Sequence, residues 1–303
     1  MPIKIQSDLP ARSILEQENI FVMTESRAES QDIRPLKIAI INLMPAKETT
    51  ETQLLRLLGN TPLQIDISLV RMENHVSRHV SDSHLERFYI PSGEVFKHKY
   101  DGMIITGAPV EQMPFEAVDY WYDLCDIIDF ARDNVFSTLY ICWGAQAGLY
   151  HEYGVKKIML DRKLFGVFKS HRTVKNEPLL RGFDDEFPVP TSRHTTVSTA
   201  SIARIKDLTI LAQNATGDVT LCKSGDNRSI FMTGHLEYDT CTLAEEYKRD
   251  KDKGIDISIP AGYFPDDDPR RRPLNTWRST AHLFYSNWLN YYVYQETPYT
   301  YAN

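Results

Sequence analysis

The chain has 303 residues, 42% of them hydrophobic, and a formal net charge of -7. This composition predicts a folded protein with a substantial core, and the acidic balance argues against a nucleic-acid-binding surface. The first residues carry no apolar signal segment and no apolar run is long enough to cross a bilayer, so we expect a cytoplasmic protein without membrane contacts.

The first half of the chain predicts alternating strands and helices. Residues 1–34 are polar, and we expect an irregular N-terminal extension. Strands are expected at 36–43, 63–70, 101–107 and 138–141, because these runs are apolar and rich in β-branched residues. A helix with a capping box at 50–53 is expected to end at Gly59, and a second helix at 117–131. The alternation predicts an α/β fold with a doubly wound, mostly parallel sheet flanked by helices.

The second half predicts a different pattern. Short strands at 195–198, 208–212 and 219–223 indicate antiparallel additions to the edge of the sheet, and a further apolar strand is expected at 229–233. Helices are expected at 239–252 and 274–295, and the loop between them places three aspartates beside three arginines. We interpret that loop as solvated and self-paired, and we expect no metal site. The expected organisation is an N-terminal extension (1–34), a catalytic core (35–250) and a C-terminal loop and aromatic helix packed on the core (251–303), in a single domain overall.

A cysteine lies where one of the predicted strands ends. Cys142 follows the apolar run 138–141 and precedes the small residues Gly144 and Ala145. A strand-to-helix turn exposes one side chain and directs the first N–H groups of the helix at the same point, which suits a nucleophile and an oxyanion. Taken alone, this segment favours a buried packing cysteine at a strand end.

A second strand end supplies a base and an acid. His235 and Glu237 follow the apolar run 229–233 and share one face of an extended segment. An imidazole can deprotonate a thiol when a carboxylate orients it, so Cys142, His235 and Glu237 predict a catalytic triad. Glu237 alone could also be an ordinary surface acid.

The triad resembles that of the class I glutamine amidotransferases, which implies their fold. Two residues depart from a working glutaminase: Tyr140 stands where that family usually has glycine, and Leu236 where it usually has proline. The chain is more similar, over essentially its full length, to the homoserine O-acyltransferases of methionine biosynthesis. The motifs that carry this similarity are Asn42-Leu43-Met44-Pro45-x-Lys47, Thr106-Gly107-Ala108-Pro109, Cys142-Trp143-Gly144-Ala145-Gln146, Gly234-His235-x-Glu237-Tyr238-Asp239 and Asn287-Trp288-Leu289-Asn290-Tyr291.

This resemblance implies a ping-pong acyl transfer, the first committed step of methionine biosynthesis, from an acyl-CoA to the hydroxyl of L-homoserine through a Cys142 thioester. It implies no bound cofactor and a homodimer. By the same resemblance, Lys47, Gly107 and Trp143 support the oxyanion. Lys47 could otherwise be a solvated loop residue.

The resemblance also assigns the substrate contacts. Lys163, Ser192 and Arg249 are expected to bind homoserine, although by themselves Lys163 and Ser192 are ordinary surface residues. Spacing alone favours an ion pair of Arg249 with Glu245 or Glu246.

Glu111 stands where the family distinguishes acetyl from succinyl donors. Glutamate there accompanies acetyl-CoA, and its charge and volume would disfavour a carboxylate-ended acyl group. We therefore expect acetyl-CoA as the co-substrate. The alternatives are the same enzyme with succinyl-CoA, a glutaminase subunit of an amidotransferase, and a non-catalytic protein that retains the turn as scaffold.

Overall fold

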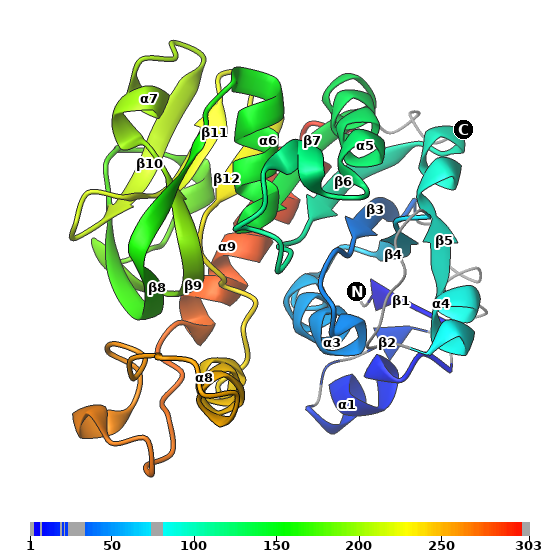
Figure 1. The fold of residues 1–303 in the computed structure, drawn as a ribbon. Helices are drawn as coiled ribbons and strands as arrows, with labels where there is room; N and C mark the ends of the chain where they lie inside the picture. Colours follow the sequence, from blue (N-terminus) through cyan, green and yellow to red (C-terminus); the bar gives the residue numbers. More distant parts are fainter. Residues whose placement is uncertain are drawn as a thin grey trace.

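The computed structural model describes residues 3–6, 8–18, 20, 22–23, 34–73 and 81–298. In these residues, twelve strands form one sheet flanked by helices (Figure 1). The strand order is β2-β1-β4-β3-β6-β7-β12-β11-β10-β8-β9, with β5 beside β4. The predicted α/β sheet is confirmed.

The strands are β1 (Ile3–Lys4), β2 (Val22–Met23), β3 (Leu36–Ile41), β4 (Ile65–Arg71), β5 (Tyr89–Pro91), β6 (Tyr100–Ile105), β7 (Val135–Ile141), β8 (Lys157–Arg172), β9 (Glu186–Val197), β10 (Leu208–Asn214), β11 (Val219–Ser224) and β12 (Ser229–Met232). The α-helices are α1 (Ala11–Gln17), α3 (Lys47–Leu58), α4 (Asp82–Phe88), α5 (Trp121–Asn134), α6 (Trp143–Tyr153), α7 (Thr199–Ala203), α8 (Thr242–Asp252) and α9 (Arg278–Asn287). Shorter helical segments are η1 (Ser92–Lys97), η2 (Phe115–Ala117), η3 (Pro178–Leu180), η4 (Pro265–Asp267) and η5 (Trp288–Tyr294).

The sheet has a parallel and an antiparallel part. From β2 to β12 neighbouring strands run parallel, and from β12 to β9 they run antiparallel. The expected antiparallel edge strands are therefore confirmed. The central strand β3 is nearly all apolar because both of its faces are covered. The carboxyl ends of β3, β6, β7 and β12 meet at one edge, which is where such sheets place their sites.

Each face of the sheet has its own hydrophobic core. On one face, leucines of α3 pack with the aromatic side chains of α9 and η5, among them Trp288. On the other face, Leu124 and Ile128 of α5 pack with Trp143 of α6. Among the described residues, none of the helices combines the length and the apolar character needed to cross a membrane.

The N-terminal part is more regular than the sequence suggests. The described residues of 1–34 form β1, α1 and β2, and β1 pairs in parallel with β4, so the expectation of an irregular extension is wrong there. Residues 24–33 of this predicted extension and 299–303 of the predicted C-terminal segment lie outside the described residues. Strands β1 and β2 are each two residues long, which is too short for a hydrophobic pattern to appear in the sequence.

All four predicted helices begin at other residues than predicted, and α5 begins at Trp121 and α8 at Thr242. Helix α3 already begins at Lys47, and the Thr50 hydroxyl donates to the carbonyl of Ala46 from inside the first turn, so the predicted capping box is wrong. Helix α9 begins at Arg278, and the aromatic segment continues as the wider turn of η5.

The hairpin of β8 and β9 is the largest element that the sequence analysis missed. β8 has 16 residues and β9 has 12, whereas only residues 195–198 were expected to be extended. β9 ends the sheet and contains Pro188 and Pro190, which lack the N–H of an interior strand. Three residues of this hairpin line the site described below: Lys163, Ser192 and His194.

Candidate active site

Cys142 lies in a strained turn between β7 and α6. Its φ is 51° and its ψ is -113°, a conformation that side chains other than glycine rarely adopt. The turn is held because the Cys142 N–H donates to the carbonyl of Met232 at 2.7 Å. A Cβ on Gly144 would lie 2.6 Å from the carbonyl oxygen of Thr106, so only glycine lets α6 start so close to β6.

His235 and Glu237 form a tight pair beside this turn. Nδ1 of His235 lies 2.6 Å from Oε1 of Glu237, and both side chains are buried. This contact leaves Nε2 as the ring nitrogen free for Cys142. The structure thus brings together the three residues that the sequence analysis proposed as a triad.

Electrostatics around His235 favour its charged form. Burial lowers the pKa of the imidazole, but the negative charges of Cys142 and Glu237 and their hydrogen bonds outweigh it, so the pKa is raised well above its usual value. A thiolate and an imidazolium therefore stabilise each other, as a nucleophilic cysteine requires.

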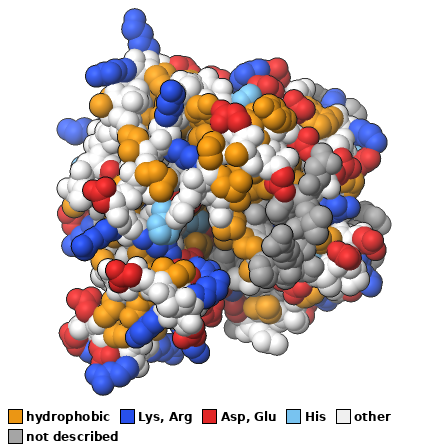
Figure 2. All heavy atoms as spheres, viewed as in Figure 1, with side chains coloured by type: hydrophobic (Ala, Val, Ile, Leu, Met, Phe, Trp, Pro, Cys, Tyr) orange, Lys and Arg blue, Asp and Glu red, His pale blue; other side chains and the backbone are white. Residues whose placement is uncertain are grey.

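A cavity of about 510 Å³ opens above Cys142 and His235. Its wall combines the loop 107–113, residues of β8 and β9, and α8. In Figure 2 the surface is hollowed above the α8 region, and histidine side chains lie at the wall of the hollow. The volume suits the reacting ends of two small substrates.

Gly107 and Trp143 lie against the nucleophile. A Cβ on Gly107 would lie 3.3 Å from Cβ of Cys142 and 3.4 Å from Cε1 of His235. Trp143 is the first residue of α6, so its N–H has no partner within the helix and is suited to an oxyanion. The Trp143 side chain is fully buried, and the centroids of the Trp143 and Phe115 rings are 5.8 Å apart. This packing fixes the start of the helix.

Lys47 lies below the cavity and does not line it. Its amine donates to the carbonyl oxygens of Asn42, at 2.5 Å, and Met44, at 3.5 Å. Burial lowers its pKa to about 8, although Glu51 opposes this shift. Lys47 therefore holds the loop whose residues Met44 and Pro45 form one wall of the cavity.

Lys163, Ser192 and Arg249 converge on the opposite wall, on two acids of α8. Ser192 Oγ donates to Glu246 at 2.5 Å, and the Lys163 amine lies 3.5 Å from Glu246 and 3.3 Å from Asp250. Arg249 pairs with Asp250 at 2.7 Å, whereas the spacing favoured Glu245 or Glu246. The structure thus brings the three predicted substrate residues together and adds Glu246 and Asp250.

Tyr238 links this wall to the triad. Its ring stacks on the His235 imidazole with the centroids 4.1 Å apart, and its hydroxyl donates to Glu246 at 3.1 Å. Tyr238 belongs to the Gly234–Asp239 motif, and the motif gives no sign of this double contact. One buried side chain thus contacts both the base and the acidic wall.

Glu111 lies on the cavity loop and reaches across to β9. Its Oε2 accepts hydrogen bonds from the N–H groups of His194, at 2.9 Å, and Thr195, at 3.3 Å, and from the Thr195 hydroxyl at 3.1 Å. The carboxylate is therefore fixed at the cavity wall.

Arg193 is a buried cation that the sequence analysis missed. It is 2% exposed, and Nη1 donates to the carbonyl of Thr195 at 3.0 Å. Burial lowers its pKa, and the negative charge of Cys142 is the largest effect that opposes this shift. Because a buried guanidinium stays charged, Arg193 adds to the field that favours a thiolate.

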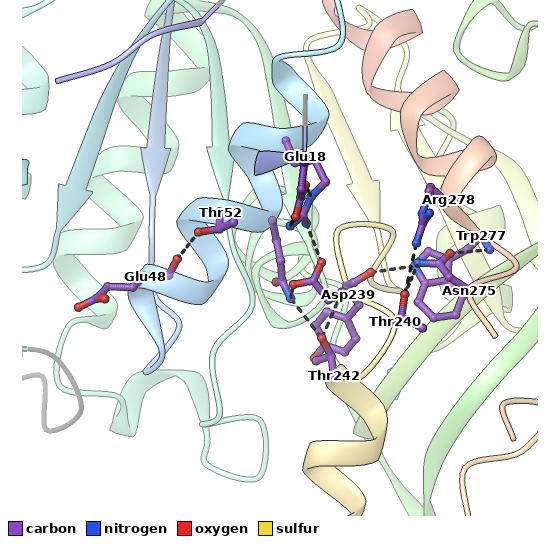
Figure 3. A network of polar contacts seen from close by, with 12 residues as sticks. Glu18, Glu48, Thr52, Asp239, Thr240, Thr242, Asn275, Trp277 and Arg278 are labelled. Atoms are coloured by element: carbon purple, nitrogen blue, oxygen red, sulfur yellow. Dashed lines mark hydrogen bonds and ion pairs between the residues drawn. The ribbon is translucent and has the colours of Figure 1, made fainter. Parts of the chain in front are cut away.

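A second, larger cavity of about 1080 Å³ lies behind Glu237, between α1, α3 and α9. Figure 3 shows the polar network at its wall, where Glu18 and Asp239 lie near each other and Thr240 faces Asn275. The Arg56 guanidinium donates hydrogen bonds to Glu18 and to Asp239, with 2.6 Å between Nη1 of Arg56 and Oδ1 of Asp239. Trp277 Nε1 donates to the carbonyl of Tyr238 at 2.9 Å. This network anchors the segment that follows the His235–Glu237 pair.

No group of three or more histidine, cysteine or acidic residues suited to a metal ion occurs in the part of the chain that the structure describes. The cysteines of the chain are free thiols. Cys222 is buried and Cys125 half-buried, whereas Cys241 is exposed.

The fold is that of solved glutamine amidotransferases. A glutamine amidotransferase from Thermotoga maritima superposes with a TM-score of 0.55 at 13% identity, covering 85% of this chain and 98% of its own. A second, from Methylobacillus flagellatus, has a TM-score of 0.53 at 13% identity, covering 85% of this chain and 95% of its own. At this identity the likeness shows the fold alone.

Sequence similarity defines the family within that fold. The family model described as "HTS: Homoserine O-succinyltransferase" matches residues 2–299, and the chain belongs to this family. A homoserine O-acetyltransferase of Geobacillus sp. strain WCH70 is 60% identical over 99% of both chains. One of Brevibacillus brevis is 55% identical over 100% of this chain and 99% of its own.

Proposed function

We propose that this protein is a homoserine O-acetyltransferase, which transfers the acetyl group of acetyl-CoA to the hydroxyl of L-homoserine through a thioester on Cys142. The observation that carries the proposal is the Cys142–His235–Glu237 site at the floor of a cavity whose wall holds Lys163, Ser192 and Arg249. Full-length relatives at 55–60% identity bear this name.

In the first half-reaction, Cys142 reacts as a thiolate, with the proton of the pair on Nε2 of His235. The thiolate attacks the thioester carbonyl of acetyl-CoA, and the backbone N–H groups at the start of α6 stabilise the oxyanion. The carbon–sulfur bond to CoA then breaks, and His235 returns the proton to the leaving CoA thiolate. One thioester replaces another, so the acetyl group stays activated.

In the second half-reaction, His235 takes the proton of the homoserine hydroxyl while its oxygen attacks the acetyl-enzyme. The bond between the acetyl carbon and the sulfur of Cys142 breaks, and O-acetylhomoserine forms. Cys142 is then again a thiolate that is paired with the imidazolium of His235. Glu237 holds the ring through Nδ1 in both steps. Arg249 and Lys163 are suited to the carboxylate of homoserine, and Glu246 to its ammonium group.

Acetyl is the proposed acyl group because of Glu111. Its carboxylate fills part of the cavity wall, and a second carboxylate on the acyl group would meet a fixed like charge. In this proposal the enzyme produces the acetylated amino acid for methionine biosynthesis, and it has no bound cofactor.

The testing experiment measures CoA thiol release from acetyl-CoA or succinyl-CoA, with and without L-homoserine, together with the intact mass of the protein. We expect homoserine-dependent release with acetyl-CoA and an acetyl mass increment that Cys142→Ala abolishes. Release with succinyl-CoA alone would overturn the assignment of the donor. Release of glutamate from glutamine, without any need for homoserine, would replace the proposal with a glutaminase.

The proposal includes a homodimer that acts in the cytoplasm. Light scattering of the purified protein at several concentrations tests the oligomeric state, and a monomer at all of them would exclude the dimer. Fractionation of cells with an antibody against the protein tests the compartment.

A further inference from the structure

We propose that the larger cavity, behind Glu237, is a binding site for a small organic cation, whose positive group meets the outer carboxylate oxygen of Glu237. The site is separate from the cavity above Cys142, because Glu237 lines only the first cavity and His235 only the second. A ligand held there would act on the triad from the side opposite the substrates. That action rests on the proposed acyl transfer, whereas the binding itself does not.

Glu237 presents an unpartnered oxygen to this cavity. Its Oε1 lies 2.6 Å from Nδ1 of His235, whereas its Oε2 has no hydrogen-bond partner among the described residues. Glu237 is only 8% exposed, so bulk water solvates this oxygen poorly. A buried carboxylate oxygen without a donor costs free energy, and a ligand that supplies the donor removes this cost. The free oxygen therefore points to a ligand with a hydrogen-bond donor.

The charge of the cavity wall favours a cation. The described residues that line it include five acids and two arginines: Glu18, Glu48, Glu237, Asp239, Glu245, Arg56 and Arg278. The guanidinium of Arg56 is already engaged, because it donates to both Glu18 and Asp239. Figure 3 shows Arg278 apart from this group, beside Thr240. Negative charge is therefore in excess along the wall, and it attracts a positive ligand.

A second unpartnered group and an apolar surface define the ligand further. Nδ1 of His282 is buried and has no hydrogen-bond partner in the described part of the chain. Burial and the charges of Arg278 and Arg56 lower the pKa of His282, so its ring is neutral near pH 7 and can accept a hydrogen bond. Leu236 and Trp277 line the same cavity and are almost fully buried. These groups suit an ammonium ion on a short apolar body.

Occupation of this site should slow the first half-reaction. The negative charge of Glu237 helps to keep His235 protonated, and a positive charge beside Oε2 offsets that attraction. The imidazolium of His235 and the thiolate of Cys142 stabilise each other, so the reactive thiolate becomes less populated. The ligand should therefore inhibit the enzyme without competing with homoserine, whose proposed contacts lie in the other cavity.

Titration calorimetry of the full-length protein tests the binding with benzylammonium, benzyl alcohol and benzoate, which share one ring and differ in charge. We expect benzylammonium to bind at least about 10-fold more tightly than the other two, because a charged hydrogen bond to a buried carboxylate has an effect of that size. Equal affinity for benzyl alcohol would overturn the site. Tighter binding of benzoate, or no binding of benzylammonium at millimolar concentration, would overturn it as well.

Two substitutions outside the catalytic machinery change the charge of the wall in opposite directions. Ile14→Lys places an amine on the wall at a position that is 42% exposed, and should weaken benzylammonium binding by about 10-fold. Arg278→Gln removes a positive charge and should strengthen the binding, a gain that a damaged fold cannot produce. Ile158→Lys is the matched control, because Ile158 is 48% exposed and lines neither cavity. Unchanged binding in both Ile14→Lys and Arg278→Gln would overturn the site.

CoA release from acetyl-CoA at increasing benzylammonium concentration tests the effect on the triad. We expect a slower burst of CoA release and a lower kcat, with the KM for homoserine unchanged. Inhibition that is relieved by more homoserine would place the ammonium ion at Glu246 and overturn the site. Binding with the expected preference for the cation, in a protein that shows no acyl transfer with any donor, would support the site and overturn the proposed function instead.

Discussion

Gly107 lies against Cys142 so closely that a Cβ on it would be 3.3 Å from Cβ of the cysteine. The same atom would be 3.4 Å from Cε1 of His235, so it would press on the nucleophile and the base together. We expect Gly107→Ala to lower kcat/KM by about 100-fold, since a small displacement of reacting groups has an effect of that size. Steady-state kinetics with acetyl-CoA and homoserine measure it.

Gly93→Ala is the matched control for this substitution. Its Cβ would meet only the carboxylate end of Glu73, at 3.2 Å, and such a flexible group can move aside. Both variants should unfold at nearly the same temperature as the unmodified protein. Full activity of Gly107→Ala would show that the turn has more room than the structure gives it.

The charge of Cys142 is expected to set the pKa of His235. Burial lowers that pKa, and Cys142 is the largest effect that raises it, ahead of Glu237. Cys142→Ala removes the negative charge, so the pKa of His235 should fall. The imidazole titration, followed by NMR, measures this difference, and Cys125→Ala serves as the control.

The same shift has a consequence for the reaction. Acetylation also removes the thiolate charge, so His235 should become neutral just when it must accept the homoserine proton. The rate of acetyl transfer from the acetyl-enzyme to homoserine should therefore rise with pH. The pH range of this rise should be lower than the pH range in which His235 titrates in the free enzyme. A His235 pKa equal in Cys142→Ala and the unmodified protein would contradict both expectations.

Some parts of this site are visible in the sequence because local patterns encode them. Cys142 follows an apolar strand and precedes the small residues Gly144 and Ala145, a pattern that suits a sharp strand-to-helix turn. His235 ends another apolar strand, and parallel strands bring their carboxyl ends together.

Other parts depend on contacts that no local pattern carries. Glu246 occurs in a charged helix and has the sequence context of a solvated acid, but the β8–β9 hairpin brings Ser192 and Lys163 onto it. β8 itself was missed because charged residues interrupt its apolar positions, and much of it is exposed. Arg193 alternates with two cavity residues along β9, and only the fold shows that it is buried.

Glu246 is expected to act in the second half-reaction only. It accepts hydrogen bonds from Ser192 and Tyr238, and it lies on the wall assigned to homoserine. Glu246→Gln should raise KM for homoserine by at least about 10-fold, as loss of a charged hydrogen-bonding partner does. The burst of CoA release on acetyl-CoA alone should stay unchanged. Glu245→Gln, on the exposed side of the same helix, should alter neither quantity.

Lys47 is expected to make stability depend on pH. Burial lowers its pKa from 10.5 to about 8, so between these values the unfolded chain binds a proton that the folded chain lacks. Stability must therefore rise with pH across that window. At 1.36 kcal/mol per pKa unit, the effect amounts to about 3 kcal/mol.

Lys47→Met removes this dependence, because methionine does not titrate. The free energy of unfolding of the variant relative to the unmodified protein should be most favourable at pH 7 and should decline by up to about 3 kcal/mol toward pH 10. Urea unfolding of both proteins at pH 7, 8.5 and 10 measures the difference. Lys248→Met, at an exposed position of α8, provides the control. A Lys47→Met difference that stays constant with pH would mean that the buried amine keeps its proton throughout, so that Lys47 holds the carbonyl groups of Asn42 and Met44 as a permanent ammonium ion.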